Sequence, residues 1–210
     1  MDLYTAINAR RTIRDFDERP VDMQVLEKII DAGLKAPTND HMRDWKFIII
    51  NDKADRAELL GIIPEIAPSE KEVNEVLDDW GMTDTVQRNM YLDAIPKQYS
   101  MLYNAGCLIL PFFQHDGVFL QPESMSDLNG FASIWCCIEN MLLAAAAEGI
   151  FGVTRIPGAD ESQHIKSMIG HPDDYVLPCY VGLGYPRKNA FVSVQKQVSV
   201  KDKMRMGRWQ

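Results

Sequence analysis

A short basic segment near the start of the chain holds residue types that could do chemistry. Three guanidinium groups and one hydroxyl fall within five positions, at Arg10, Arg11, Thr12 and Arg14. Arginine binds a dianionic phosphate through charge-assisted, often bidentate hydrogen bonds, and it does so better than lysine. The spacing is therefore compatible with a phosphate-binding segment. The alternative is a solvated basic turn whose charges pair with Asp15, Asp17 and Glu18.

A polar loop over 38–45 is the second candidate. It combines a hydroxyl, an amide, an imidazole and a guanidinium, at Thr38, Asn39, His41 and Arg43. We expect a helix that is capped by Asp22 and ended by Pro37 before this loop, and a buried strand over 47–50 after it. Loops between regular elements often carry binding residues, so a ligand contact is expected here.

Other catalytic arrangements do not appear in the sequence. The four histidines, at positions 41, 115, 164 and 171, lack the spacing of metal ligands, and no Gly-x-Ser-x-Gly nucleophile motif occurs. The four cysteines lie in apolar runs without a CxxC pair. We therefore expect buried, reduced thiols and no metal site.

The composition limits the class of protein. With 210 residues, 46% of them hydrophobic, the chain is long enough for one domain with a full core. Its formal charge of −8 disfavours nucleic acid and anionic membranes as partners, because both attract an excess of Lys and Arg. No signal peptide is recognisable, so a cytoplasmic protein that acts on small molecules is expected.

The elements that position these residues are built around a helix predicted over 128–147. A capping box at Ser124 and Asp127 precedes this helix, and Gly149 follows it. Its apolar residues point in every direction, so we expect burial all round, as the spine of the subunit or half covered by a second subunit. A membrane span is disfavoured because Glu139 and Asn140 interrupt the apolar run.

Strands are predicted over 107–113 and 175–183, and a strand followed by a turn over 151–158. Pro111 indicates an edge strand or a bulge. The acidic stretch 64–96 has apolar residues at helical spacing, which indicates short helices of a lid or dimer arm. A basic extension covers 187–210. We treat 1–210 as one domain in which these last two segments are variable.

Four segments, in this order, resemble motifs of the nitroreductase family. They are Arg-Arg-Thr-Ile-Arg-Asp-Phe at 10–16, Ala-Pro-Thr-Asn through Trp at 36–45, Glu-Asn-Met-Leu-Leu-Ala-Ala-Ala with Glu-Gly at 139–149, and Gly-Leu-Gly-Tyr-Pro at 182–186. The likeness covers nearly the whole chain and weakens over 64–96. It implies an α+β fold with a mixed, mainly antiparallel central sheet, flanked by helices around a buried central helix, in an intertwined homodimer.

The resemblance also implies an FMN cofactor at the subunit interface, reduced by NADH or NADPH. Arg10, Arg11, Thr12 and Arg14 would hold the FMN phosphate. The partner subunit would lay Pro37, Thr38, Asn39 and His41 along the flavin ring, beside Arg155, Ile156, Pro157 and Gly158. Lys196 in the C-terminal extension would return to the phosphate.

The chain departs from the family at His41, Arg43 and Asp44, where Asn, Gln and Pro are usual. A cationic Arg43 near the ring would stabilise reduced, anionic flavin, and a salt bridge to Asp40 or Asp44 is the alternative. The expected activity is a ping-pong reduction of a nitro, quinone or similar small-molecule acceptor. The alternatives are a flavin reductase, a reductive dehalogenase, or a flavin-binding protein without turnover.

Overall fold

The computed structural model describes residues 1–17 and 19–209 and confirms the predicted α+β fold. Its centre is a sheet in which all named strands pair antiparallel. The strand order is β1 (Trp45–Ile50), β2 (Cys107–Gln114), β5 (Tyr180–Gly184) and β3 (Phe151–Arg155), and the short β4 (Tyr175–Val176) pairs with β2. Thr12 adds one parallel bridge to Gly152, so the N-terminal segment runs beside β3.

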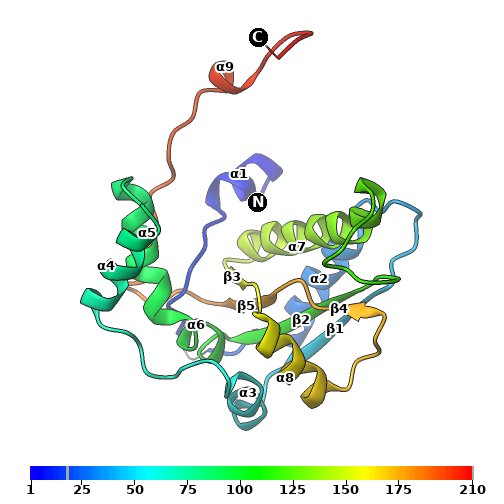
Figure 1. Ribbon diagram of the computed structural model, residues 1–210, viewed down its shortest axis with the longest axis horizontal. Helices are drawn as coiled ribbons and strands as arrows, with labels where there is room; N and C mark the ends of the chain where they lie inside the picture. The colour runs from blue at the N-terminus through cyan, green and yellow to red at the C-terminus, as the bar shows by residue number, and fades with distance from the viewer. Residues whose placement is uncertain (18, 210) are drawn as a thin grey trace.

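Helices cover both faces of the sheet (Figure 1). One face carries α1 (Leu3–Ala9), α2 (Met23–Leu34) and α7 (Asn129–Ala147), and the other carries α3 (Lys53–Leu60), α6 (Ser100–Tyr103) and α8 (Ala159–Ile169). At one end lie α4 (Glu70–Asp79), α5 (Thr85–Ala94) and the 3-10 turn η1 (Ile95–Lys97). The turn η2 (Met125–Leu128) leads into α7, and α9 (Val200–Lys203) lies in the C-terminal tail.

The apolar run of β2 is explained by its position between two cores. Ile109 and Phe113 belong to the core beneath α2 and α7, whereas Leu108 and Leu110 belong to the core on the opposite face. Successive strand residues point to opposite faces of a sheet, so a strand covered on both sides must be apolar throughout.

Pro111 lies in this central strand, so the expected edge or bulge is wrong. It is opposite Phe47 of β1. On the other side of β2, the pairing with β5 ends at Ile109 and the pairing with β4 begins at Phe113. Pro111 therefore falls in a gap of that ladder, where its missing N–H breaks no strand hydrogen bond.

The predicted boundaries of the long helix are confirmed. The capping box of Ser124 and Asp127 is formed at the start of η2, and Gly149 follows α7 in a left-handed conformation with φ +73°. On its inner side α7 packs against α2, where a Cβ added to Gly33 would lie 2.6 Å from the Cγ of Met141. Only glycine permits this close approach of the two helices.

The expected burial of α7 on all sides is wrong for the single chain. Its outer face exposes Ala132, Cys136 and Glu139, because the helix forms an outer layer of the subunit. By length and composition alone, Met125–Ala147 could cross a membrane, a property that core helices share, and here its inner side is part of the core. Cover of the outer face by a second subunit remains a prediction.

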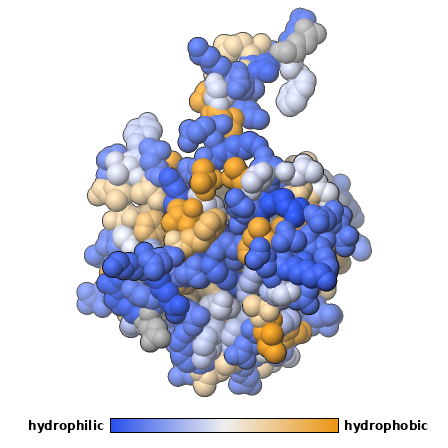
Figure 2. All heavy atoms as spheres, turned by 90° about the vertical axis from the view of Figure 1, so that its left-hand side faces the viewer, coloured by the Kyte–Doolittle hydropathy of each residue, from blue (hydrophilic) through white to orange (hydrophobic). Residues whose placement is uncertain are grey.

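The acidic stretch forms short helices, as predicted. Trp80 and Tyr91 pack edge to face between α4 and α5, with ring centroids 5.7 Å apart. The end of the basic C-terminal tail, with α9, stands clear of the body, and patches of hydrophobic surface lie beside the base of the tail (Figure 1 and Figure 2). Val194 in this tail is 75% exposed and Trp209 is 95% exposed. The division of the chain into one domain with two variable segments remains a prediction.

Candidate functional site

Arg10, Arg11 and Thr12 line a common cavity of about 180 Å³, which we call the Arg10 cavity. Its other walls come from α7 and β3. They are Trp135, Ile138, Glu139, Leu142, Gly152 and Thr154. The cavity thus combines two guanidinium groups and two hydroxyl-bearing side chains with an aromatic ring. This set of donors matches the needs of a phosphate group, which accepts several charge-assisted hydrogen bonds.

The backbone beside β3 fixes the position of these side chains. The N–H of Ile13 donates to the carbonyl oxygen of Gly152 over 3.3 Å, and the Ile13 side chain is buried in the core. Arg11 donates to the carbonyl oxygens of Asn8, at 2.5 Å, and Arg10, at 2.7 Å, and so caps the end of α1. The segment is therefore anchored on both sides of Thr12.

Arg10 makes an ion pair with α7. Its Nε lies 3.1 Å from Oε1 of Glu139, and both side chains are partly exposed. This pair connects the residue after α1 to the outer face of α7, within the wall of the Arg10 cavity.

Arg14 does not line the Arg10 cavity but takes part in a mostly buried ion cluster. Its NH1 lies 3.2 Å from Oδ2 of Asp93 on α5, and these side chains are 10% and 9% exposed. Lys97 pairs with Asp93 and, at 2.6 Å, with Asp15. Burial alone would lower the pKa of Lys97, but the hydrogen bonds that its ammonium donates to these two carboxylates raise the pKa above its usual value. The cluster ties the basic segment to the α4–α5 end of the molecule.

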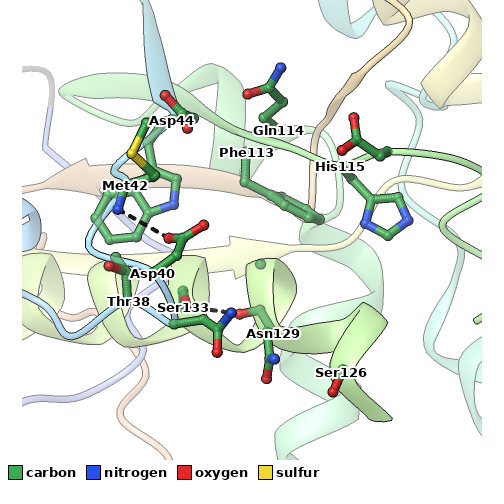
Figure 3. A pocket seen from close by; sticks show the side chains of 14 residues that line it. Thr38, Asp40, Met42, Asp44, Phe113, Gln114, His115, Ser126, Asn129 and Ser133 are labelled. Carbon is green, nitrogen blue, oxygen red and sulfur yellow. Dashed lines mark hydrogen bonds between the residues drawn. The ribbon is translucent and has the colours of Figure 1, made fainter. Parts of the chain in front are cut away.

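The predicted loop lines a second cavity, of about 350 Å³, which we call the Thr38 cavity (Figure 3). The loop contributes Thr38, Asn39, Asp40, Met42 and Asp44. β2 and the segment after it contribute Phe113, Gln114, His115 and Asp116, and the start of α7 contributes Asn129, Gly130 and Ser133. The buried Oγ1 of Thr38 has no hydrogen-bond partner among the described residues.

The Thr38 cavity is polar and acidic. Asp40, Asp44 and Asp116 line it, and among the described residues that line it none is Lys or Arg. His41, in the same loop, takes a positive φ of 61°. Residues other than Gly, Asn, Asp and His rarely adopt this conformation. An acidic wall of this kind favours neutral or cationic ligands over anionic ones.

Arg43 does not line either cavity. Its Nε donates to the carbonyl oxygen of Leu34 over 2.7 Å, and its NH1 donates to the carbonyl oxygen of His41 over 3.0 Å. Leu34 is the last residue of α2, so the guanidinium caps that helix. Its hydrogen bonds thus go to carbonyl oxygens in place of the alternative partners Asp40 and Asp44.

The remaining predicted residues lie elsewhere in the single chain. Arg155 pairs with Glu161, with NH2 2.7 Å from Oε1, and its Nε donates to Oε1 of Gln98 over 2.8 Å. Ile156 is 67% exposed, and Gly158 is the N-cap residue of α8. Lys196 lies 2.8 Å from Asp84 at the start of α5. Pro37 and Pro157 do not line the two cavities. The roles predicted for these residues are not tested by the single chain.

Several cavity residues were missed by reasoning from the sequence. Gly152 and Thr154 share one face of β3, which the two-residue period of a strand could have indicated. Trp135, Glu139 and Leu142 recur at helical spacing and therefore share one face of α7. The sequence alone gave no indication of which helix face would meet Arg10.

Comparisons with known proteins identify the family and its relatives. The sequence model of the nitroreductase family matches residues 7–185. An iodotyrosine deiodinase from Nematostella vectensis is 25% identical over 200 residues, covering 91% of this chain and 69% of that protein. The chain spans about two thirds of the length of the curated deiodinases it matches.

Solved structures agree in fold. An oxidised iodotyrosine deiodinase, solved with FMN and 3-iodo-L-tyrosine bound, superposes with a TM-score of 0.70 at 17% identity, covering 95% of this chain and 97% of that one. Nitroreductase A from Vibrio parahaemolyticus gives a TM-score of 0.68 at 18% identity, covering 100% of this chain and 78% of that one.

Proposed function

The chain belongs to the nitroreductase family, and from this premise we propose that it is an FMN-dependent oxidoreductase whose two active sites are each built from two copies of the chain. The observation that carries the proposal is the meeting of Arg10, Arg11 and Thr12 in one cavity. Bound FMN would supply the redox chemistry, taking a hydride from NADH or NADPH and returning electrons to a small acceptor.

The Arg10 cavity fits the phosphate end of FMN. Two guanidinium groups and the Thr12 hydroxyl offer the donors that a phosphate needs. The cavity is nevertheless small, at about 180 Å³, compared with the roughly 300–1,000 Å³ of pockets that enclose a whole ligand. The flavin ring must therefore extend beyond the walls that a single chain provides.

We propose that a second copy of the chain supplies the missing walls of the site. Successive residues of α7 are rotated by about 100° around the helix axis. The exposed face of α7 is centred on Cys136, and Ser133, which lines the Thr38 cavity, lies on one side of this face. Trp135 and the Arg10 cavity lie on the other side. If two α7 helices pack across this face about a two-fold axis that runs along them, the isologous contact brings the Thr38 cavity of one copy toward the Arg10 cavity of the other. One flavin can then contact both motifs.

The Thr38 cavity is the proposed position of the acceptor. Its carboxylates, Asp40, Asp44 and Asp116, would raise the local concentration of cationic compounds and repel anions. Trp45 and Phe113 supply aromatic surface for a flat acceptor. The chain's own contribution is thus binding, orientation and charge.

The proposal is tested by the affinity of the apoprotein for FMN and riboflavin, which differ by the phosphate. Arg10→Ala removes a charge-assisted contact of roughly 1.5–3 kcal/mol, so FMN binding should weaken about ten- to a hundredfold while riboflavin binding is unchanged. Equal affinity of the wild type for both compounds would refute the phosphate site. Bleaching of the bound chromophore by NADH and its recovery with a nitroaromatic test the activity.

A reductive dehalogenase is the second candidate, favoured by the iodotyrosine deiodinases that match 91% of this chain. The same binding residues would serve it, because only the acceptor differs. Chemically reduced protein mixed with 3-iodo-L-tyrosine should then release iodide. The rate of this release should exceed the rate at which a nitroaromatic oxidises the reduced protein. Oxidation by the nitroaromatic without iodide release would favour the first candidate.

A further inference from the structure

Glu139 stands out on the exposed face of α7, where its neighbours Ala132 and Cys136 are small or apolar. Its carboxylate does not point freely into solvent but lies 3.1 Å from Nε of Arg10, and both residues line the Arg10 cavity. An anionic side chain within a proposed anion site needs an explanation, because it opposes the charge that the site is built to attract.

The atoms that meet suggest this explanation. Glu139 engages Nε, while the two terminal nitrogens of Arg10 have no hydrogen-bond or ion-pair partner among the described residues. A guanidinium presents its donors in a fixed plane, so a carboxylate on Nε also fixes the direction of the terminal pair. That pair is the fork that grips phosphate oxygens in a bidentate contact.

We propose that Glu139 is a positioning residue, which holds Arg10 so that its terminal nitrogens face the phosphate of the cofactor. The proposal rests on the proposed FMN site. Glu139 itself does not touch the phosphate. It restricts the rotamers of a flexible side chain before the cofactor arrives, so less freedom is lost on binding.

Two other roles for Glu139 lead to different outcomes. If the carboxylate competes with the phosphate for Arg10, its removal should tighten FMN binding. If the ion pair only fastens α1 to α7, its removal should weaken FMN and riboflavin equally, because riboflavin depends on the same fold. The partial exposure of both side chains weakens any repulsion between Glu139 and the phosphate, since water screens it.

The experiment measures FMN and riboflavin affinity of the apoprotein by fluorescence titration, for the wild type, Glu139→Ala and Glu139→Gln. Glu139→Ala should weaken FMN about two- to tenfold, the loss expected when one flexible side chain must be ordered on binding, and should leave riboflavin unchanged. Glu139→Gln keeps the length of the side chain and an oxygen that can accept a hydrogen bond from Nε of Arg10, and it removes the negative charge. It should bind FMN at least as tightly as the wild type.

Two controls separate this effect from others. Glu148→Ala, at the exposed end of α7, removes the same charge without touching Arg10 and should leave FMN binding unchanged. In the Arg10→Ala background, Glu139→Ala should have no further effect, because a positioning residue acts only through its partner.

The proposal is overturned if Glu139→Ala binds FMN as tightly as the wild type or tighter, if riboflavin weakens to the same degree, or if Glu139→Gln loses as much as Glu139→Ala. These outcomes are distinct from failure of the proposed function, in which the wild type itself binds FMN no better than riboflavin. That result would overturn both proposals.

Discussion

Labelling of one cysteine can test the prediction that a second copy of the chain covers the outer face of α7. Cys107, Cys137 and Cys179 are buried, and burial raises the pKa of each thiol to about 12. At pH 8 roughly one in ten thousand of such groups is a thiolate, the form that reacts with a labelling reagent. Only Cys136 is exposed in the single chain among the described cysteines. Labelling of the native protein therefore reports on Cys136 alone.

The expected stoichiometry follows directly. A folded monomer should label one thiol per chain, and the unfolded chain should label all four. If a second copy covers Cys136, the native protein should label close to none within minutes at micromolar concentration. The labelling rate should then rise on dilution, because dissociation uncovers the thiol.

Ala132→Glu provides the perturbation. Ala132 is exposed on the same face as Cys136, so a carboxylate there costs a monomer little but places two like charges in a symmetric contact. The variant should remain folded and label one thiol per chain. Adding Cys136→Ser to this variant should abolish the labelling. Fast labelling of one thiol in the native wild type at micromolar concentration would refute cover of α7 by a second copy.

Three further predictions concern pH, Arg43 and the acceptor. The three buried thiols keep their protons to about pH 12, whereas the unfolded chain loses them near the ordinary thiol pKa of 9.0. The contribution of these thiols to stability should therefore be constant below about pH 9 and fall above it, by up to about 1.4 kcal/mol per thiol per pH unit, and a urea midpoint that does not move between pH 9 and pH 11 would contradict this. Arg43→Gln removes the cap on Leu34 and should lower the free energy of unfolding by about 1 kcal/mol, while the flavin potential stays unchanged. A potential lowered by tens of millivolts would instead restore the electrostatic role at the ring. Asp40→Asn should reduce the ratio of kcat/KM for cationic over anionic nitroaromatics severalfold, since one charge at ~4 Å in water is worth about 1 kcal/mol, whereas Asp160→Asn on α8 should leave this ratio unchanged.

The sequence was sufficient for those parts of the site that depend on local residue types. Arg10, Arg11 and Thr12 are adjacent and their side chains carry the chemistry, so their meeting in one cavity could be anticipated. The ends of α7 were also predictable, because a capping box and a following glycine are local signals.

The ion-pair partners of residues that lie far apart in the sequence could not be predicted. Arg14 pairs with Asp93, 79 residues away, and Lys196 pairs with Asp84, 112 residues away. Charge type gives no information about which of many carboxylates will be near once the chain packs. The prediction made from Pro111 was wrong for a related reason, since the gap in the ladder beside Pro111 arises from where β5 ends and β4 begins.

The most direct test of the account is complementation between two defective chains. One variant, Arg10→Ala with Thr12→Ala, removes two of the donors that line the Arg10 cavity. The other, Asn39→Trp, fills the exposed edge of the Thr38 cavity. If each flavin site takes one motif from each chain, a purified heterodimer of the two variants has one intact site and one site with both defects.

FMN titration of this heterodimer, with the two homodimers as controls, is the decisive measurement. The account predicts that half of the sites in the heterodimer bind FMN with the affinity of the wild type, while both homodimers bind it weakly. If both motifs served a site within one chain, every site would carry one defect, and none would recover. A heterodimer without any site of wild-type affinity would contradict the account.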